Sequence, residues 1–279
     1  MIRTFLITAS LFSSLSWFGA GMSHAGGPKA DLWARWQAHD PAATARLDHG
    51  AWGRFLARYL RIEPRGANRL DYARVTAADK AGLAAYVAEM EAVAVSGLNR
   101  REQLAYWINL YNALTVKVML DHWPVTSIRD IDISPGLFSD GPWGKKLVVV
   151  MGEKLALDDI EHRILRPIWK DPRIHYAVNC ASIGCPDLAP QPFTGDIADR
   201  MLNAAAQTYV NSPRGVRIDG DGRLVVSKIY DWFIDDFGGT EAGVLAHLAQ
   251  HAGPDLKPRL AGRTAIDDYA YDWRVNAVR

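Results

Sequence analysis

The stretch REQLAYWINLYNALTVKVMLDH, residues 101–122, carries the strongest secondary-structure pattern in the sequence. Its apolar side chains recur at intervals of three and four, which is the period of an α-helix with a buried stripe. They are Leu104, Trp107, Ile108, Tyr111, Leu114 and Val118. Pro124 follows and cannot continue a helix, because proline lacks the backbone N–H and clashes with the preceding turn. The stretch therefore predicts a long helix from about residue 101 to residue 122.

Shorter helices are expected on the N-terminal side of this stretch. Between residues 26 and 66, aromatic and leucine side chains recur at spacings of three and four, which suits short helices. Thr76 is placed to cap a further helix, with Asp79 at its third position as a variant of the capping box. We expect residues 26–69 to form a helical N-terminal segment ahead of the main domain, residues 70–279.

Strands and helices alternate after the long helix. The expected elements are a β-branched run at 146–151, a short helix at 158–166 ended by Pro167, a buried strand at 174–180, a helix at 194–210, a hairpin with strands 216–218 and 224–226, and a last helix at 241–251. Helices first and mixed elements later favour the α+β class. The expected architecture is a helical N-terminal part packed on a small mixed or antiparallel sheet, in a single compact domain.

The first 25 residues have the order of a secretory signal peptide. Arg3 is followed by an apolar stretch at 5–20, and small residues lie at Ser23 and Ala25, before a cut at Gly26. The apolar stretch is about 16 residues long and a membrane span needs about 20. We expect cleavage there, a periplasmic or secreted protein, and no transmembrane segment after signal removal.

Composition indicates a folded protein with no electrostatic preference for nucleic acid. Hydrophobic residues make up 49% of the chain and there are ten tryptophans, which argues for a real core. The formal net charge is +1, and loss of Arg3 with the signal peptide brings it to zero. Nucleic-acid binding normally needs a basic surface. The expected partner is a small molecule or peptide, and no cofactor or metal is indicated.

The densest group of reactive side chains is HYAVNCASIGCP, residues 175–186. In an oxidising compartment, a close pair such as Cys180 and Cys185 favours a structural disulfide. On a regular strand, His175 and Asn179 point to one face and Cys180 to the other. A nucleophilic cysteine with His175 as its base therefore needs a bend before Cys180, or Cys185 turning back. A redox-active pair is a third alternative.

Asn109 and Asn112 lie three residues apart on the long helix, with Glu102 on roughly the same side. Asparagine is a weak helix former, so two asparagines in an apolar helix call for an explanation. Either their amides tie neighbouring backbone, or they line a pocket beside His175.

The segment 158–166 has acids in its first turn and Arg166 in its last, which suits the helix dipole. Glu161 and Arg166 belong to a solvated face on the simplest interpretation. Asp171 and Arg173, just before the expected strand, are candidates to pair with them.

Several apparent motifs are incomplete. His247 and His251 have zinc-like spacing but no glutamate between them. Residues 219–222 resemble the start of a calcium loop, but Tyr230 stands where the final glutamate belongs, so a hairpin turn is expected. The run at 180–184 lacks the first glycine of a nucleophile elbow.

A loop rich in glycine and proline spans residues 134–144. The segment 136–141 has no following Lys-Ser/Thr and is therefore no phosphate loop. Glycine-rich loops near sites often move, so this one is interpreted as a candidate lid.

Taken together, several segments resemble the family of bacterial and plant proteins catalogued as domain of unknown function 547. The resemblance extends from about residue 70 to the end of the chain. Its pieces are EQLAYWINLYNALT (102–115), LDDIEHRILRP (157–167), DPRIHYAVNCASIGCP (171–186), SKIYDWFIDDFG (227–238) and YDWRVN (271–276). The combination is specific, although each piece alone is weak.

The resemblance implies a set of motif positions but no settled activity. These positions are Asn109, Asn112, Glu161, Arg166, Arg173, His175, Cys180, Cys185, Pro186, Lys228, Trp232 and Asp236. Ala156 departs from the family, in which serine often precedes the helix. Some plant relatives carry glutaredoxin-like modules, but this chain has no C-x-x-C.

Two main hypotheses of function remain open. The first, slightly favoured because it asks less of the geometry, is a binding protein with a polar cleft around His175 and the Cys180/Cys185 loop. Binding residues would be Asn109, Asn112, Glu161, Arg166, Arg173, Lys228 and Asp236. The second is a thiol hydrolase or acyl transferase in which a cysteine is the nucleophile and His175 the base. Whether the protein is an enzyme stays open.

Overall fold

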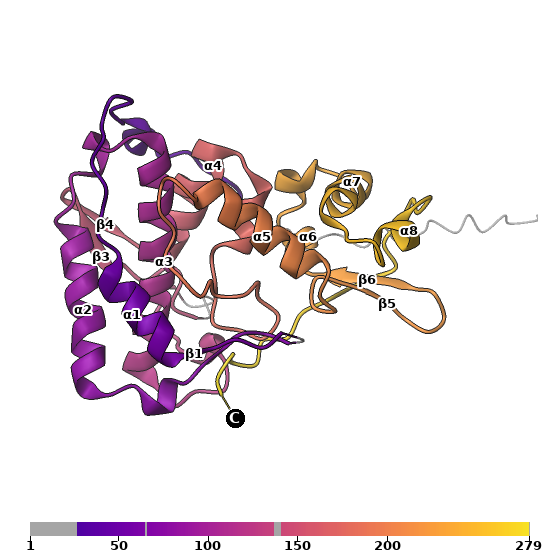
Figure 1. Ribbon diagram of the computed structural model, residues 1–279, viewed down its shortest axis with the longest axis horizontal. Helices are drawn as coiled ribbons and strands as arrows, with labels where there is room; N and C mark the ends of the chain where they lie inside the picture. Colours follow the sequence, from indigo (N-terminus) through magenta and orange to yellow (C-terminus); the bar gives the residue numbers. More distant parts are fainter. Residues whose placement is uncertain (1–26, 65, 137–140, 279) are drawn as a thin grey trace, which may run out of the picture.

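The computed structural model describes residues 27–64, 66–136 and 141–278. The expected signal peptide, residues 1–25, lies outside these residues and stays a prediction. The long helix α3, Arg100–His122, runs through the N-terminal half of the molecule (Figure 1). Asn99 caps it by accepting a hydrogen bond from the backbone N–H of Glu102. The predicted helix is thus confirmed within one residue at its start.

α3 is buried on nearly all sides, which exceeds the single stripe expected from its spacing. Eighteen of its 23 residues are buried, including the polar Gln103, Asn109, Asn112 and Thr115. A helix that is covered all round is a central element of the core, not a surface helix. The rest of the N-terminal half packs around it.

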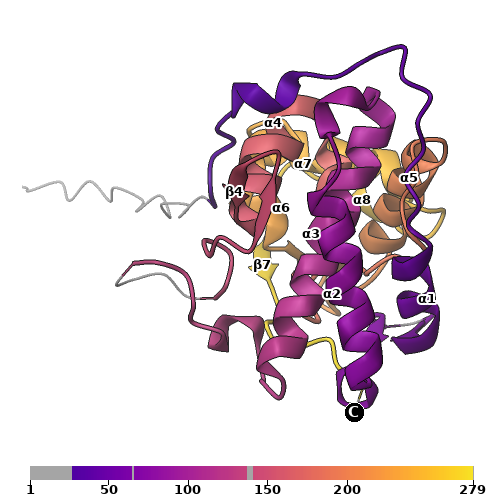
Figure 2. The same cartoon turned by 90° about the vertical axis from the view of Figure 1, so that its left-hand side faces the viewer.

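The elements beside α3 come mainly from the first third of the chain. In Figure 2, α2 lies alongside α3, and α1 packs on α2. Thr76 caps α2 by accepting from the backbone N–H of Asp79, as predicted. The elements are the 3₁₀ turn η1 (Ala34–Gln37), α1 (Gly50–Tyr59), the antiparallel pair β1 (Leu60–Arg61) and β2 (Arg69–Leu70), η2 (Tyr72–Arg74), α2 (Ala77–Glu91), η3 (Val95–Gly97) and η4 (Ile128–Asp130).

The middle of the chain forms a hairpin and a series of short helices. The hairpin joins β3 (Val148–Val150) to β4 (Glu153–Leu155). It is followed by a π-helix, η5 (Asp159–Leu165), then α4 (Arg166–Trp169), the 3₁₀ helix η6 (Pro172–Tyr176) and α5 (Ala198–Val210). The predicted end of a helix at Pro167 is wrong, because Pro167 lies in the first turn of α4, where a missing N–H costs little.

The predicted strand at 174–180 is also wrong. Asp171 accepts a hydrogen bond from the backbone N–H of Arg173, and Pro172 fixes its own φ at the start of η6. These two residues start a helical turn, and the chain then passes into a loop. The alternation of faces assumed for His175 and Cys180 therefore does not apply.

The C-terminal part forms a three-stranded sheet with helices beside it (Figure 1). Its order is β5-β6-β7, antiparallel between β5 and β6, and parallel between β6 and β7. The hairpin predicted at 216–226 is confirmed. The elements are β5 (Val216–Ile218), β6 (Leu224–Ser227), α6 (Ile229–Trp232), η7 (Ile234–Phe237), α7 (Glu241–His251), α8 (Lys257–Leu260) and β7 (Asp268–Ala270).

Two hydrophobic clusters fill the molecule. One surrounds α3, and the other lies between α5, the three-stranded sheet and α7. The chain joins them at the end of η6, since Tyr176 belongs to the second cluster and Val178 to the first. The candidate site is built on this junction. The α+β prediction with small mixed and antiparallel sheets in one compact domain is confirmed.

None of the helices within the described ranges is both long enough and apolar enough to cross a membrane.

Candidate functional site

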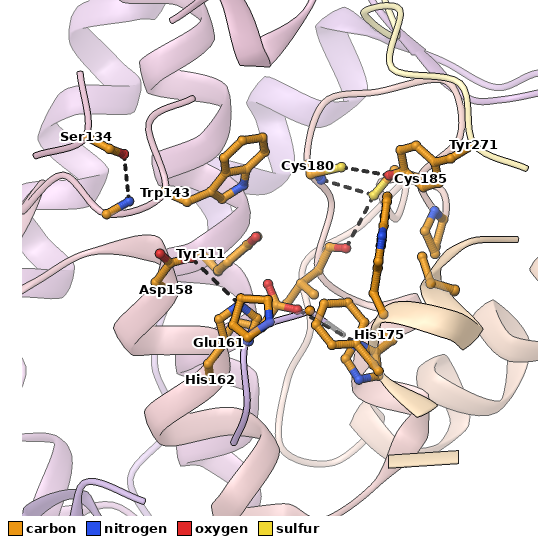
Figure 3. Close-up of a pocket in the computed structure, with 18 of the residues that line it drawn as sticks. Tyr111, Ser134, Trp143, Asp158, Glu161, His162, His175, Cys180, Cys185 and Tyr271 are labelled. Carbon is orange, nitrogen blue, oxygen red and sulfur yellow. Dashed lines mark hydrogen bonds and ion pairs between the residues drawn. The ribbon is translucent and has the colours of Figure 1, made fainter. Parts of the chain in front are cut away.

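A pocket of about 540 Å³ lies at the junction of the two clusters (Figure 3). Its walls come from segments far apart in the chain. They are Gly27, Pro28, Tyr111, Ser134, Pro135, Trp143, Gly144, Asp158, Glu161, His162, His175, Val178, Cys180, Cys185, Pro186, Ile229, Trp232, Phe233, Tyr271 and Trp273. An apolar pocket with a few convergent polar groups is the usual form of a small-molecule site.

Aromatic rings form much of the wall. The rings of Tyr271 and Trp273 have centroids 4.7 Å apart, and Trp232 lies 4.9 Å from Tyr271. Trp143 meets Trp273 edge-on at 5.9 Å. Such contacts hold large side chains in fixed positions. The wall is therefore a continuous surface of mutually packed aromatic rings.

A chain of alternating charges runs from the pocket wall into the protein. Glu161 and His175 line the pocket, whereas the predicted binding residues Asp236 and Arg166 are not among its lining residues and contact His175 from behind. The Nε2 atom of His175 lies 2.7 Å from an Asp236 carboxylate oxygen, and its Nδ1 atom lies 3.7 Å from a Glu161 oxygen. Arg166 donates from Nε to the same oxygen of Asp236 at 2.5 Å. The His175 ring also stacks on Phe233, with centroids 4.3 Å apart. The order Arg166–Asp236–His175–Glu161 places each charge next to its opposite.

The π-helical geometry of η5 explains how Glu161 and Arg166 reach the same chain. The backbone N–H of Arg166 donates to the carbonyl of Glu161, five residues earlier. Single π turns inside helices are often found at functional sites. The interpretation of Glu161 and Arg166 as a solvated face is wrong, since both are buried.

The protonation of this chain follows from its contacts. Burial opposes ionisation of Glu161, but the His162 and His175 rings and the Tyr111 hydroxyl lower its pKa to about 2. Burial likewise opposes charge on His175, yet hydrogen bonds to Asp236 and Glu161 raise its pKa above the usual value. Desolvation lowers the pKa of His162 to about 4. The two rings thus shift in opposite directions: His162 is neutral at neutral pH, and His175 is the ring that holds its proton more strongly.

The pKa of Asp158 is shifted in the opposite direction from the pKa of Glu161. Burial, together with the negative charges of Glu161 and Asp159, raises the pKa of Asp158 to about 6. Two carboxyl groups in one pocket with pKa values driven apart are the arrangement that acid–base chemistry uses.

The two cysteines are free thiols, so the predicted disulfide is wrong. The pair is separated by 3.2 Å, which is well beyond a sulfur–sulfur bond of about 2.05 Å. The loop turns at Ala181, whose φ is 57°, and the backbone N–H of Cys180 donates to the sulfur of Cys185 at 3.1 Å. Sequence spacing brings the two residues together, but it does not determine whether their sulfurs bond.

Hydroxyl groups surround the sulfur of Cys180. It lies 3.0 Å from the Tyr271 hydroxyl and 3.2 Å from that of Ser182, which are themselves 2.9 Å apart. Hydrogen bonds from the Cys185 thiol and from these two hydroxyls lower the pKa of Cys180, against the effect of burial. Burial raises the pKa of Cys185 well above its ordinary value. Cys180 is thus the thiol that ionises first.

His175 does not pair with either sulfur in the described contacts. Its two ring nitrogens face carboxylates, as Figure 3 lets the reader follow for Glu161. The hydrogen-bonded His–Cys pair considered from the sequence is therefore not formed. His175, Cys180 and Cys185 nevertheless line one pocket.

Asn109 and Asn112 hold the backbone of the site segment. Asn109 exchanges two hydrogen bonds with the backbone of Phe193, at 2.8 and 2.9 Å. Asn112 donates to the carbonyl of Ala177 at 2.8 Å and accepts from the N–H of Asn179 at 2.9 Å. Of the two alternatives, backbone attachment is the one observed. Asn112 thus positions the backbone just before Cys180, Asn109 anchors the chain at Phe193, and neither amide lines the pocket.

Two other predicted binding residues lie away from the pocket wall. Arg173 binds Asp171 and Asp199. It is therefore occupied by its own loop and by α5, and not by Glu161. Lys228 lies exposed at the start of α6, beside the aromatic wall.

His247, one member of the zinc-like histidine pair, has a partner within the core. The Nε2 atom of His247 lies 2.8 Å from the Tyr176 hydroxyl and shares a hydrogen bond with it in the second cluster. Among the residues that the structure describes, no group of three or more His, Cys, Asp or Glu side chains is arranged to hold a metal ion. Part of the loop interpreted as a lid, residues 137–140, lies outside the described residues, and the lid stays a prediction.

Sequence reasoning missed several wall residues. Trp143 and Tyr271 were not singled out, although YDWRVN was part of the resemblance, and Asp158 was assigned to a helix end. Because these residues lie far from residues 175–186 along the chain, no local sequence pattern connects them with the site. The resemblance pointed toward this wall at two places, residues 271–276 and Trp232.

The fold and pocket define a class of protein: an α+β domain with a thiol pair and a buried carboxylate–imidazole chain. Residues 95–210 match the model of the family described as "Protein of unknown function, DUF547". This match supports the family resemblance and includes Glu161, His175 and both cysteines. Asp236 and Tyr271 lie outside the matched residues. Comparison with curated proteins and with solved structures gave no match.

Proposed function

We propose that this protein, after export, binds a small organic molecule in the aromatic pocket. One observation carries the proposal: packed aromatic rings, two carboxyls with opposite pKa shifts and the partly exposed thiol of Cys180 converge on one cavity of about 540 Å³. Strongly shifted pKa values in a cleft favour a functional site over a packing defect. The apolar part of the ligand lies on the rings, and its polar part faces Glu161 and Asp158.

Binding of the neutral dye Nile red tests this proposal. We expect saturable binding with enhanced dye fluorescence, weakened about 10-fold in Trp143→Ala, because loss of a buried aromatic contact costs about 1–2 kcal/mol. Trp33→Ala is the matched control, since Trp33 is also partly buried but lines no part of this pocket. Equal affinity in wild type and Trp143→Ala would contradict the proposal.

A second candidate function is thiol-dependent acyl transfer or hydrolysis, favoured by the hydroxyl groups around Cys180. In this reaction the Cys180 thiolate attacks the carbonyl carbon of an ester or thioester. The new S–C bond forms, the bond to the leaving group breaks, and the leaving group takes a proton from water. A water molecule then hydrolyses the thioester and regenerates the thiol. No imidazole base is required, because the thiolate is already favoured by its donors.

p-Nitrophenyl acetate tests this second function. We expect a stoichiometric burst of p-nitrophenolate and an acetyl group on Cys180, both lost in Cys180→Ser. Cys185→Ser is the matched control, since a serine hydroxyl at that position can still donate to the Cys180 sulfur. A burst that persists in Cys180→Ser would eliminate this candidate.

A further inference from the structure

The ring of His162, in the pocket wall, has a proton position that its buried partner determines. A guanidinium nitrogen of Arg166 lies 3.0 Å from Nδ1 of His162, and an arginine side chain has only donors. Nδ1 therefore accepts this hydrogen bond and carries no proton. Desolvation lowers the pKa of His162 to about 4, which agrees with a neutral ring. The one ring proton lies on Nε2, so this nitrogen is a hydrogen-bond donor at neutral pH.

A carboxylate lies beside this donor. Nε2 of His162 is 3.7 Å from a carboxylate oxygen of Asp158, which is too long for a hydrogen bond. Both residues line the pocket, and Figure 3 shows their side chains next to each other. Within residues 27–64, 66–136 and 141–278, neither Nε2 nor the Asp158 carboxylate makes a hydrogen bond. The pocket wall therefore presents a donor and an acceptor side by side, and each can serve a ligand.

We propose that this pair binds an uncharged amide whose N–H and C=O lie on one edge, as in a lactam or a primary carboxamide. The amide oxygen accepts a hydrogen bond from Nε2 of His162, and the amide N–H donates one to Asp158. The inference rests on the proposed pocket function and adds the class of ligand.

The two hydrogen bonds make the site selective. An ester or a ketone offers the oxygen but no N–H, so it leaves the Asp158 carboxylate without a partner. Sites built to hydrogen-bond a ligand N–H discriminate against the analogue that lacks it for this reason. The flat face of a conjugated lactam can also pack on the aromatic rings of the wall.

A lactam and its N-methyl derivative test the inference, because they differ in the N–H that Asp158 is expected to bind. The probes are 2-quinolone and N-methyl-2-quinolone, which are flat aromatic molecules with the same carbonyl group. Isothermal titration calorimetry of the full chain measures both dissociation constants, at a pH well above the Asp158 pKa of about 6. We expect 2-quinolone to bind about 10-fold more tightly, which is the effect of one hydrogen bond to a charged group.

Variants assign the two hydrogen bonds separately. The preference for 2-quinolone should disappear in Asp158→Ala and persist in part in Asp158→Asn, which keeps an acceptor oxygen. In His162→Phe both ligands should bind about 5-fold more weakly, because both lose the donor to their carbonyl. Asp235→Ala and His122→Phe are the matched controls and should bind like the wild type, since both residues are exposed and neither lines the pocket.

Nile red binding separates this inference from the proposed pocket function. Equal affinity for the two quinolones, a preference that survives in Asp158→Ala, or no binding of either quinolone to a protein that binds Nile red would overturn the amide site and leave the pocket function intact. Unchanged affinities in His162→Phe would overturn it as well. If neither Nile red nor a quinolone binds, the pocket function is refuted, and the inference is refuted with it.

The comparison of the two quinolones on the wild-type protein needs no variant, so a variant that fails to fold does not weaken it. Nile red binding by each variant shows that its pocket is formed.

Discussion

Replacing Arg166 with alanine is expected to lower the free energy of unfolding by about 3–5 kcal/mol. The Arg166 side chain is 3% exposed and bonds three different groups. It donates to Asp236, to the carbonyl of Pro28 at 2.6 Å, and lies 3.0 Å from His162 Nδ1. Its guanidinium also stacks on Phe233 at 4.6 Å. Removing Arg166 leaves Asp236 with His175 as its remaining partner, and it leaves the Pro28 carbonyl and His162 Nδ1 without the Arg166 donor. Breaking a buried ion pair by removing one partner is the costly case.

Urea denaturation of the full chain measures this loss. Arg46→Ala is the control, because its ion pair with Asp196 is exposed on both sides, at 49% and 63%. That variant should change the free energy of unfolding by about 1 kcal/mol or less. Similar losses in Arg166→Ala and Arg46→Ala would show that the buried charge chain does not stabilise the fold.

Glu161→Gln is expected to remove a pH-dependent part of the stability. The pKa of Glu161 falls from 4.5 to about 2 on folding, a shift worth about 3 kcal/mol. A carboxyl whose pKa is lowered by folding stabilises the protein above its unfolded pKa. That stabilisation is lost as the pH falls from about 4.5 toward 2. Glutamine keeps the shape but has no charge to lose.

The difference in unfolding free energy between wild type and Glu161→Gln should therefore be greatest above pH 4.5 and shrink as the pH falls toward 2. Denaturation at a series of pH values measures it. Glu89→Gln is the control, since Glu89 is exposed on α2 and should give a small difference throughout. A difference for Glu161→Gln that stays constant with pH would contradict the assigned ionisation.

The regular elements of this fold could be predicted from local pattern, and the irregular ones could not. α3, the cap of α2 and the hairpin at residues 216–226 follow from periodicity, capping and turn residues. The π turn at Asp159–Leu165 depends on packing of Glu161 and Arg166 against distant partners. Its sequence reads equally well as an ordinary helix with a solvated face.

The candidate site, too, could be predicted only where a local pattern or the family motif marks its residues. Residues 175–186 and Glu161 were found because chemistry-bearing side chains gather there or belong to the family motif. The rings of Trp143 and Tyr271 join them only through tertiary packing. The disulfide prediction failed because compartment and spacing favour a bond, while the loop geometry places the sulfur of Cys185 as a hydrogen-bond partner of Cys180.

Iodoacetamide labelling of the native protein, with and without Nile red, tests the shared pocket of ligand and thiol most directly. Tryptic mass spectrometry should find the carbamidomethyl group on Cys180 and almost none on Cys185, which is buried. Saturating Nile red should slow the labelling of Cys180. Preferential labelling of Cys185, or labelling of Cys180 at the same rate when the dye is bound, would contradict the account.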